Sequence, residues 1–201
     1  MFIALQDAVA APRTILVFGD SLSAAYGIRP EQGWVALLTQ RLRSQGYGYQ
    51  VVNASVSGET TQGGLERLPR ALQLHQPGVV ILELGGNDGL RGLPVSETRA
   101  NLARMVQLSQ AAGAHVLLVG IRMPPNYGPR YTEQFARMFP ELASQYHVPL
   151  VPFLLEQVAL NPTRMQPDGL HPNAQGEPPV LDTLWPHLKP LLNRNPHDGG
   201  T

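Results

Sequence analysis

Residues 79–84 read Val79-Val80-Ile81-Leu82-Glu83-Leu84 and run directly into Gly85-Gly86-Asn87-Asp88-Gly89. A short, nearly continuous apolar run that ends at glycine is typical of a strand buried on both faces of a parallel sheet. Residues 14–18, which read Thr14-Ile15-Leu16-Val17-Phe18, have the same form and end at Gly19. We therefore predict two buried strands, each followed by a glycine-containing turn.

Outward from these runs, strand-like and helical patterns alternate along the chain. We predict further strands at 50–53, 115–121 and 148–151. Apolar residues at helical spacing predict helices near 34–42, 65–72, 96–113, 131–146 and 180–192. We expect Ser96 to cap the third of these helices, Pro69 to kink or restart the second, and Pro186 to interrupt the last. This alternation predicts an α/β fold with a parallel sheet covered by helices on both faces.

Length and composition exclude several classes of protein. The 201 residues suit one domain, and a 43% hydrophobic content is enough for a folded core. Fifteen basic residues balance fifteen acidic ones, so charge gives no reason to expect a nucleic acid partner. Because the chain has no cysteine, disulfides, cysteine nucleophiles and thiolate metal sites are excluded. No apolar stretch approaches the ~20 residues of a membrane span, so we expect no stable membrane insertion.

The two ends of the chain differ from its centre. Ala8-Val9-Ala10-Ala11 is similar to the end of a secretory signal, although no basic region or long apolar region precedes it. We interpret residues 1–12 as a flexible arm or a signal-peptide remnant. Residues 13–192 are then a single domain, and residues 193–201 are a flexible tail.

In a parallel sheet, ligands bind beyond the carboxyl ends of the strands, so the residues that follow each strand are candidates for chemistry. Ser21 follows the first strand and Asn87 the third, while Asp168 and His171 come after the fifth. Histidine titrates near neutral pH and can take the proton of a serine, and an acid three residues away can orient the imidazole. The backbone N–H groups of Ser21 and Gly58 and the Asn87 amide can stabilise an oxyanion. The set predicts acyl transfer.

Each of these residues also has a structural interpretation. Ser21 alone could be a helix cap, and Asp168 alone could form an Asx-turn with Gly169. Asn87-Asp88-Gly89 has the composition of a turn. The chemical interpretation depends on finding all of them, in this order, each after a predicted strand.

Four blocks of the sequence resemble those of the SGNH hydrolases, also called GDSL lipases or esterases. The blocks are Gly19-Asp20-Ser21-Leu22-Ser23, Gly58, Gly85-Gly86-Asn87-Asp88 and Asp168-Gly169-Leu170-His171-Pro172. Further stretches, 52–60, 83–92 and 125–131, are similar to the bacterial thioesterase I / lysophospholipase L1 / arylesterase branch.

The resemblance carries expectations for fold and site. It implies a flavodoxin-like three-layer α/β/α sandwich with a five-stranded parallel sheet. It also implies a catalytic triad of Ser21, Asp168 and His171, and an oxyanion hole of Ser21, Gly58 and Asn87. No metal or organic cofactor is implied. The branch is similar to periplasmic or secreted enzymes of Gram-negative bacteria.

The predicted function is hydrolysis of esters and thioesters of apolar acyl groups. We expect the substrate to be a small molecule or a lipid, and the enzyme to be a monomer. Apolar residues beside the site segments could line the acyl groove, namely Leu22, Leu90, Leu93, Met123, Tyr127 and Leu170. We expect the loop 122–130 to bind the acyl chain or close over it. One alternative is a carbohydrate esterase that deacetylates sugars. Another is a carbohydrate-binding or peptidoglycan-associated domain without activity, which the intact Ser, Asp and His argue against. A third is a non-catalytic nucleotide- or flavin-binding module, for which the chain lacks a G-x-G-x-x-G or P-loop motif.

Overall fold

The computed structural model describes residues 13–192, so the two terminal segments predicted from the sequence lie outside the described residues. It contains one five-stranded sheet in the order β2-β1-β3-β4-β5, with every neighbouring pair parallel. The strands are β1 (Arg13–Gly19), β2 (Tyr49–Asn53), β3 (Val79–Glu83), β4 (His115–Val119) and β5 (Leu150–Val151). This strand order is that of flavodoxin-like folds, which confirms the predicted fold class.

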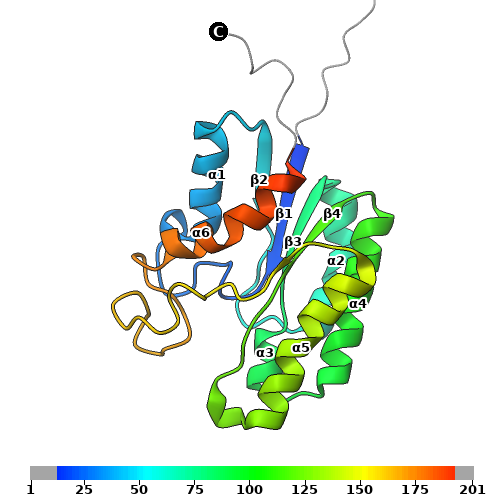
Figure 1. Ribbon diagram of the computed structural model, residues 1–201. Coiled ribbons are helices and arrows are strands. Elements are labelled where there is room, and N and C mark those ends of the chain that lie inside the picture. The colour runs from blue at the N-terminus through cyan, green and yellow to red at the C-terminus, as the bar shows by residue number, and fades with distance from the viewer. Residues whose placement is uncertain (1–12, 193–201) are drawn as a thin grey trace, which may run out of the picture.

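Helices cover both faces of the sheet (Figure 1). On one face lie α1 (Trp34–Ser44) and α6 (Glu177–Leu188), and on the other α2 (Thr61–His75), α4 (Val95–Ala111) and α5 (Pro129–Tyr146). The short helix α3 (Gly86–Leu90) follows β3. Three short 3-10 helices are η1 (Pro30–Gln32), η2 (Pro125–Tyr127) and η3 (Lys189–Leu191).

The alternation of side chains along each strand builds two cores. In β1, Leu16 and Phe18 pack with α2, α4 and α5, whereas Ile15 and Val17 pack with α1 and α6. All four side chains are fully buried. Since burial of apolar area is the main stabilising contribution, strands with no polar face belong at the centre of the sheet, where β1 and β3 lie.

Helices α4, α2 and α6 differ in detail from their predictions. Helix α4 begins at Val95 after Pro94, whose carbonyl accepts Glu97 N at 3.0 Å, so Ser96 is inside the helix and does not cap it. Helix α2 continues through Pro69, and α6 continues through Pro186. A proline removes one helical hydrogen bond, and the burial of neighbours such as Leu68 and Leu184 offsets that loss.

Among residues 13–192, no helix is long and apolar enough to cross a membrane. The same residues hold no group of three or more His, Asp or Glu side chains placed to bind a metal ion.

Candidate active site

Ser21 lies in the turn that follows β1, at the carboxyl edge of the sheet. Two backbone hydrogen bonds close the turn, from Ala24 N to Asp20 O at 3.0 Å and from Tyr26 N to Ser21 O at 3.2 Å. The buried Asp20 side chain folds back beneath it, and its Oδ1 accepts Leu22 N at 3.1 Å. Ser21 therefore lies in a turn that backbone hydrogen bonds and the Asp20 carboxyl group hold in place.

His171 is carried by a loop between β5 and α6 that Asp168 organises. Oδ1 of Asp168 accepts Leu170 N at 2.9 Å and His171 N at 3.1 Å, and Gly169 between them adopts a left-handed φ of 67°. Gln166 N donates to His171 O at 2.8 Å and closes the loop from the other side. The Asx-turn that we considered as an alternative role for Asp168 is present, and it brings the second carboxylate oxygen to the imidazole.

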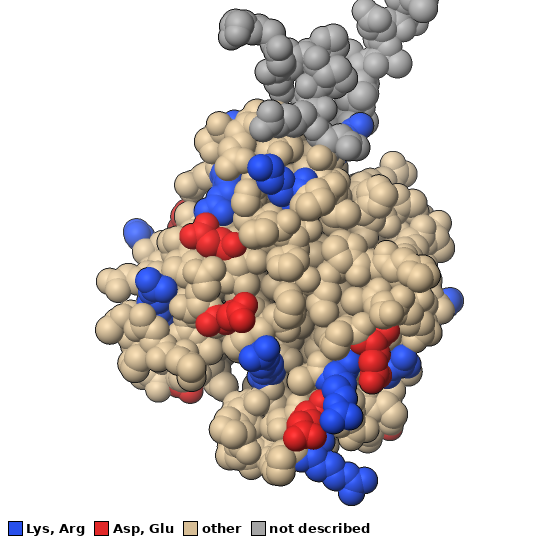
Figure 2. All heavy atoms as spheres, viewed as in Figure 1, with Lys and Arg blue, Asp and Glu red and all other residues tan. Residues whose placement is uncertain are grey.

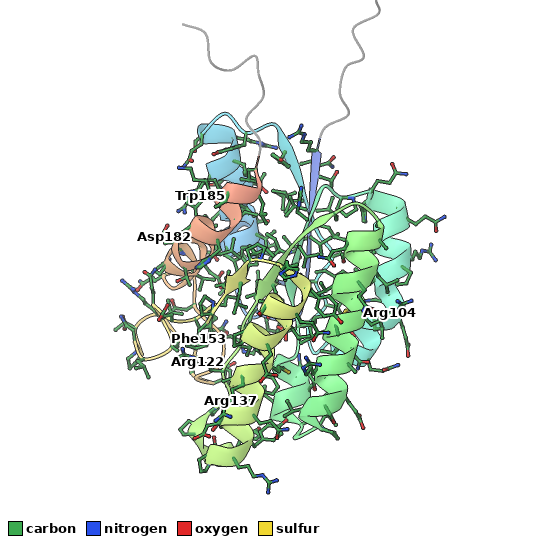
Figure 3. All side chains as sticks on the ribbon, turned by 45° about the vertical axis from the view of Figure 1, so that its right-hand side comes forward. Arg104, Arg122, Arg137, Phe153, Asp182 and Trp185 are labelled. Atoms are coloured by element: carbon green, nitrogen blue, oxygen red, sulfur yellow. The ribbon has the colours of Figure 1, made fainter. Side chains whose placement is uncertain are left out.

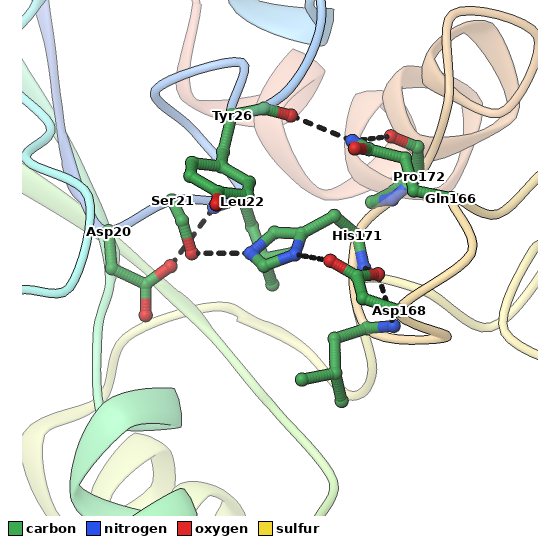
Figure 4. A network of polar contacts seen from close by, with 9 residues as sticks. Asp20, Ser21, Leu22, Tyr26, Gln166, Asp168, His171 and Pro172 are labelled. Atoms are coloured by element: carbon green, nitrogen blue, oxygen red, sulfur yellow. Dashed lines mark hydrogen bonds and ion pairs between the residues drawn. The ribbon is translucent and has the colours of Figure 1, made fainter.

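The three predicted triad residues form one hydrogen-bonded chain (Figure 4). Ser21 Oγ lies 2.8 Å from His171 Nε2, and His171 Nδ1 lies 2.7 Å from Asp168 Oδ2. Partial burial acts to raise the pKa of Asp168, but hydrogen bonds from the His171 side chain and from Leu170 N and His171 N outweigh it and lower the pKa. The carboxylate is therefore ionised at neutral pH and can stabilise an imidazolium.

Asn87 reaches the same place from α3. The helix begins after Gly85, whose φ of 115° requires glycine, and it corrects the interpretation of Asn87-Asp88-Gly89 as a turn. Asn87 Nδ2 donates to Asp20 Oδ2 at 3.1 Å and to Glu59 O at 2.9 Å. The amide thus lies between the nucleophile turn and the loop that follows β2.

Gly58 belongs to that loop, with a left-handed φ of 79°. The loop is held at both ends, because Val56 N donates to Gly19 O at 3.0 Å and Arg91 Nη2 donates to Gly58 O at 3.1 Å. The structure therefore brings the loop of Gly58 against Asn87 and the end of β1, so that Ser21, Gly58 and Asn87 follow three separate strands.

A buried pair of carboxyl groups supports the site, and sequence reasoning gave it no role. Glu83 ends β3 opposite Gly19, and its Oε2 accepts Ser23 Oγ at 2.7 Å and Asp20 N at 3.3 Å. Burial raises the pKa of Asp20 to about 6. Burial, together with the charge of Asp20, raises the pKa of Glu83 well above its usual range. The signal in the sequence was one acid in an otherwise apolar strand.

Beside Ser21 and His171 opens a cavity of about 590 Å³ with mostly apolar walls. The surface is hollowed between the segment after β5 and the start of α5 (Figure 2). Four predicted substrate contacts line the cavity: Leu22, Leu90, Met123 and Leu170. Sequence reasoning missed further apolar lining residues: Ile121, Phe153, Leu154, Leu155, Ala159, Leu160 and Met165.

Within the 122–130 loop, Tyr127 and Arg122 differ in their relation to the cavity. Tyr127 is not among the lining residues; its hydroxyl donates to Leu90 O at 2.8 Å, and its ring stacks with Tyr131. Arg122 lines the cavity, with its guanidinium 5.0 Å from the centroid of the Phe153 ring (Figure 3). Leu93 also does not line the cavity.

Comparisons with known proteins agree with this geometry. Esterase TesA of Pseudomonas aeruginosa is 54% identical over 183 residues, which cover 91% of both chains. A crystal structure of TesA superposes with a TM-score of 0.88 and covers 90% of this chain and 100% of its own. Thioesterase 1/protease 1/lysophospholipase L1 of Escherichia coli K12 is 47% identical over 92% of this chain and 88% of its own. Arylesterase of Vibrio mimicus is 45% identical over 94% of each. The model of the GDSL-like lipase/acylhydrolase family matches residues 17–177, and the chain belongs to this family, the SGNH hydrolases.

Proposed function

We propose that this protein hydrolyses carboxylic esters and thioesters of apolar acyl groups through an acyl-enzyme intermediate. One observation carries the proposal: the hydrogen-bonded chain Ser21–His171–Asp168 lies at the wall of an apolar cavity. The names of the relatives, esterase, thioesterase and arylesterase, support the same chemistry.

In the first half of the reaction, Ser21 Oγ attacks the acyl carbon while His171 Nε2 takes its proton. The C–O or C–S bond to the leaving group then breaks, and the imidazolium returns the proton to the departing oxygen or sulfur. In the second half, water attacks the acyl-enzyme, His171 takes a proton from that water, and Ser21 Oγ leaves with it. Asp168 holds the imidazole and stabilises its charged form, and no metal or organic cofactor takes part.

The negative charge on the carbonyl oxygen requires donors fixed before the reaction. We assign this role to the backbone N–H groups of Ser21 and Gly58 and to Nδ2 of Asn87. Both N–H bonds of Asn87 are directed to Asp20 Oδ2 and Glu59 O. A substrate oxygen that enters the site therefore competes with, or shares, one of these acceptors.

The acyl chain occupies the cavity of about 590 Å³. Each methylene group buried there contributes about 0.8 kcal/mol, so binding strengthens with chain length until the cavity is filled. Leu22, Leu170 and Phe153 lie among its walls, and their hydrocarbon surface favours a lipid acyl group over an acetylated sugar.

The proposed setting is the periplasm or the exterior of a Gram-negative cell, with the enzyme acting as a monomer on small-molecule or lipid esters. The signal-like run Ala8-Val9-Ala10-Ala11 supports the setting. The zero net charge favours neither nucleic acid nor an anionic membrane as a partner.

The test is a series of p-nitrophenyl esters from acetate to palmitate, run beside acyl-CoA thioesters and acetylated xylan. We expect kcat/KM to rise from acetate toward medium chains for both esters and thioesters. The matched control is Ser21→Ala, which keeps the fold and removes the nucleophile. Hydrolysis confined to acetylated sugar would replace the lipid-acyl proposal with the carbohydrate esterase.

A further inference from the structure

The ring of Tyr26 contacts the imidazole of His171, although Tyr26 belongs neither to the triad nor to the lining of the acyl cavity. The ring centroids of Tyr26 and His171 are 4.7 Å apart, with the planes tilted by 42°. In Figure 4 the Tyr26 ring lies above the Ser21–His171 contact. Although its ring touches that of His171, Tyr26 is 52% exposed.

The position of this ring is fixed by the backbone. Tyr26 O accepts Gln166 Nε2 at 2.7 Å, and the same amide nitrogen donates to Pro172 O at 2.9 Å (Figure 4). On either side of Tyr26, Ala25 and Gly27 adopt left-handed φ angles of 57° and 75°. A non-glycine residue seldom takes such a φ unless its surroundings impose it. The nucleophile turn and the histidine loop are thus tied together at Tyr26.

In acyl transfer, the oxyanion, the acyl chain and the leaving group point in different directions from the reacting carbon. On the tetrahedral carbon bound to Ser21 Oγ, the oxyanion faces Asn87 and the acyl chain enters the cavity. Tyr26 is not among the residues that line this cavity, whereas His171 is. The leaving group must stay within reach of His171 Nε2, which protonates it, and the exposed Tyr26 ring is the apolar surface next to that atom outside the acyl cavity.

We propose that Tyr26 is a specificity-determining residue whose exposed ring forms one wall of the leaving-group position and favours aromatic leaving groups. The inference rests on the proposed function of the same site. Aromatic rings pair favourably when offset or edge-on, and for one half-exposed ring the selectivity amounts to about 3- to 10-fold in rate. An alkyl alcohol of similar reactivity gains less from the same ring.

The experiment compares phenyl butyrate with trifluoroethyl butyrate in the wild type, Tyr26→Leu and Tyr26→Phe. Both esters form the same butyryl-enzyme, so kcat/KM reports the step in which the leaving group departs. We expect Tyr26→Leu to lower kcat/KM for the phenyl ester about 3- to 10-fold more than for the alkyl ester. Tyr26→Phe, the matched control that keeps the ring, is expected to preserve the wild-type ratio.

A second measurement uses the reverse direction and avoids the difference in ester reactivity. Benzyl alcohol and butanol compete with water for the butyryl-enzyme, and the transfer products report which acceptor the leaving-group position prefers. We expect Tyr26→Leu to reduce benzyl transfer selectively.

Equal losses for both esters, with an unchanged transfer ratio, would overturn the proposal and make Tyr26 only a support for His171. An unchanged ester ratio with no loss would also overturn it. If the wild type hydrolyses neither ester although the protein is folded, the proposed function itself has failed, and Tyr26 has no leaving group to select.

Discussion

The side-chain nitrogen of Asn87 lies 3.1 Å from Oδ2 of Asp20, the residue that immediately precedes Ser21 in the chain. This contact joins the turn after β1 to the helix after β3. Because Asp20 Oδ1 also accepts Leu22 N at 3.1 Å, one buried carboxyl group fixes both the nucleophile turn and the amide that we assign to the oxyanion hole.

Replacing Asn87 with alanine is expected to lower kcat about 10²–10³-fold and to leave KM within a few-fold of wild type. The reason is that the oxyanion exists in the transition state and not in the bound substrate. Steady-state kinetics on p-nitrophenyl butyrate, with the melting temperature as the folding control, checks this. A kcat within about threefold of wild type would reduce Asn87 to a structural residue.

Asp20→Asn tests whether Asp20 acts through Asn87. The amide keeps one oxygen to accept Leu22 N but places an NH2 group where Oδ2 was, and that group cannot accept from Asn87 Nδ2. We expect kcat to fall about tenfold or more, and the double variant with Asn87→Ala to be no slower than Asn87→Ala alone. The melting temperature should not fall, because a buried charge beside Glu83 is removed. If the decreases in kcat of the two single variants multiply in the double variant, Asp20 does not act through Asn87.

Because we assign the acyl chain to the cavity, a larger side chain in the cavity wall should shift the preference of the enzyme to shorter acyl chains. Ala159 is among the lining residues, and Ala159→Phe places a ring in the space proposed for the distal part of the chain. We expect kcat/KM for the octanoate ester to fall at least tenfold, which is about 1.4 kcal/mol, while the acetate ester stays within about twofold. The acetate rate of the same variant is the control. A parallel decrease for both esters would indicate general damage and not a shortened cavity.

Glu177 predicts a pH dependence of stability. Its buried Oε2 accepts Trp34 N at 2.8 Å, and Trp34 Nε1 donates to Leu22 O at 3.1 Å beside the nucleophile. Burial raises the pKa of Glu177 from 4.5 to about 7, although the Trp34 hydrogen bond acts to lower it. Between these two pH values the folded state binds more protons than the unfolded state, so the free energy of unfolding decreases as pH rises through the window.

Glu177→Gln keeps an acceptor oxygen for Trp34 N and removes the ionisation. Urea denaturation at pH 5 and pH 8 measures the free energy of unfolding of both proteins. From pH 5 to pH 8, we expect this free energy to change in favour of the variant, relative to wild type, by on the order of 2 kcal/mol. Asp182→Asn is the matched control, since Asp182 lies on the same helix with its side chain 54% exposed. A difference between Glu177→Gln and wild type that does not change with pH would contradict the assignment.

The parts of the fold that could be predicted are those encoded by local periodicity. Apolar runs such as 14–18 and 79–84 identified the central strands, and the rule that ligands bind at strand ends brought Ser21, Asn87 and His171 together in advance. Helix α3 was missed because Asn87-Asp88-Gly89 has turn composition, whereas its helical form depends on the left-handed Gly85 before it.

Other features depend on contacts between distant segments, which no local pattern encodes. Glu83 meets Asp20 because β1 and β3 are neighbours in a register that places Gly19 opposite Glu83. The cavity walls from Phe153 to Met165 lie in a segment without helical or strand periodicity, so tertiary packing alone determines their position. The contact between Tyr26 and His171 likewise joins two loops that are far apart in the sequence.

Labelling the intact protein with a fluorophosphonate and mapping the modified peptide would show whether Ser21 is the nucleophile. We expect one phosphonylated residue, Ser21, whose hydroxyl lies 2.8 Å from His171 Nε2. We expect Ser21→Ala to be unlabelled, folded and slower in kcat by on the order of 10⁴–10⁶. A label on Ser23, Ser55 or Ser57, or full activity in Ser21→Ala, would contradict this role of Ser21.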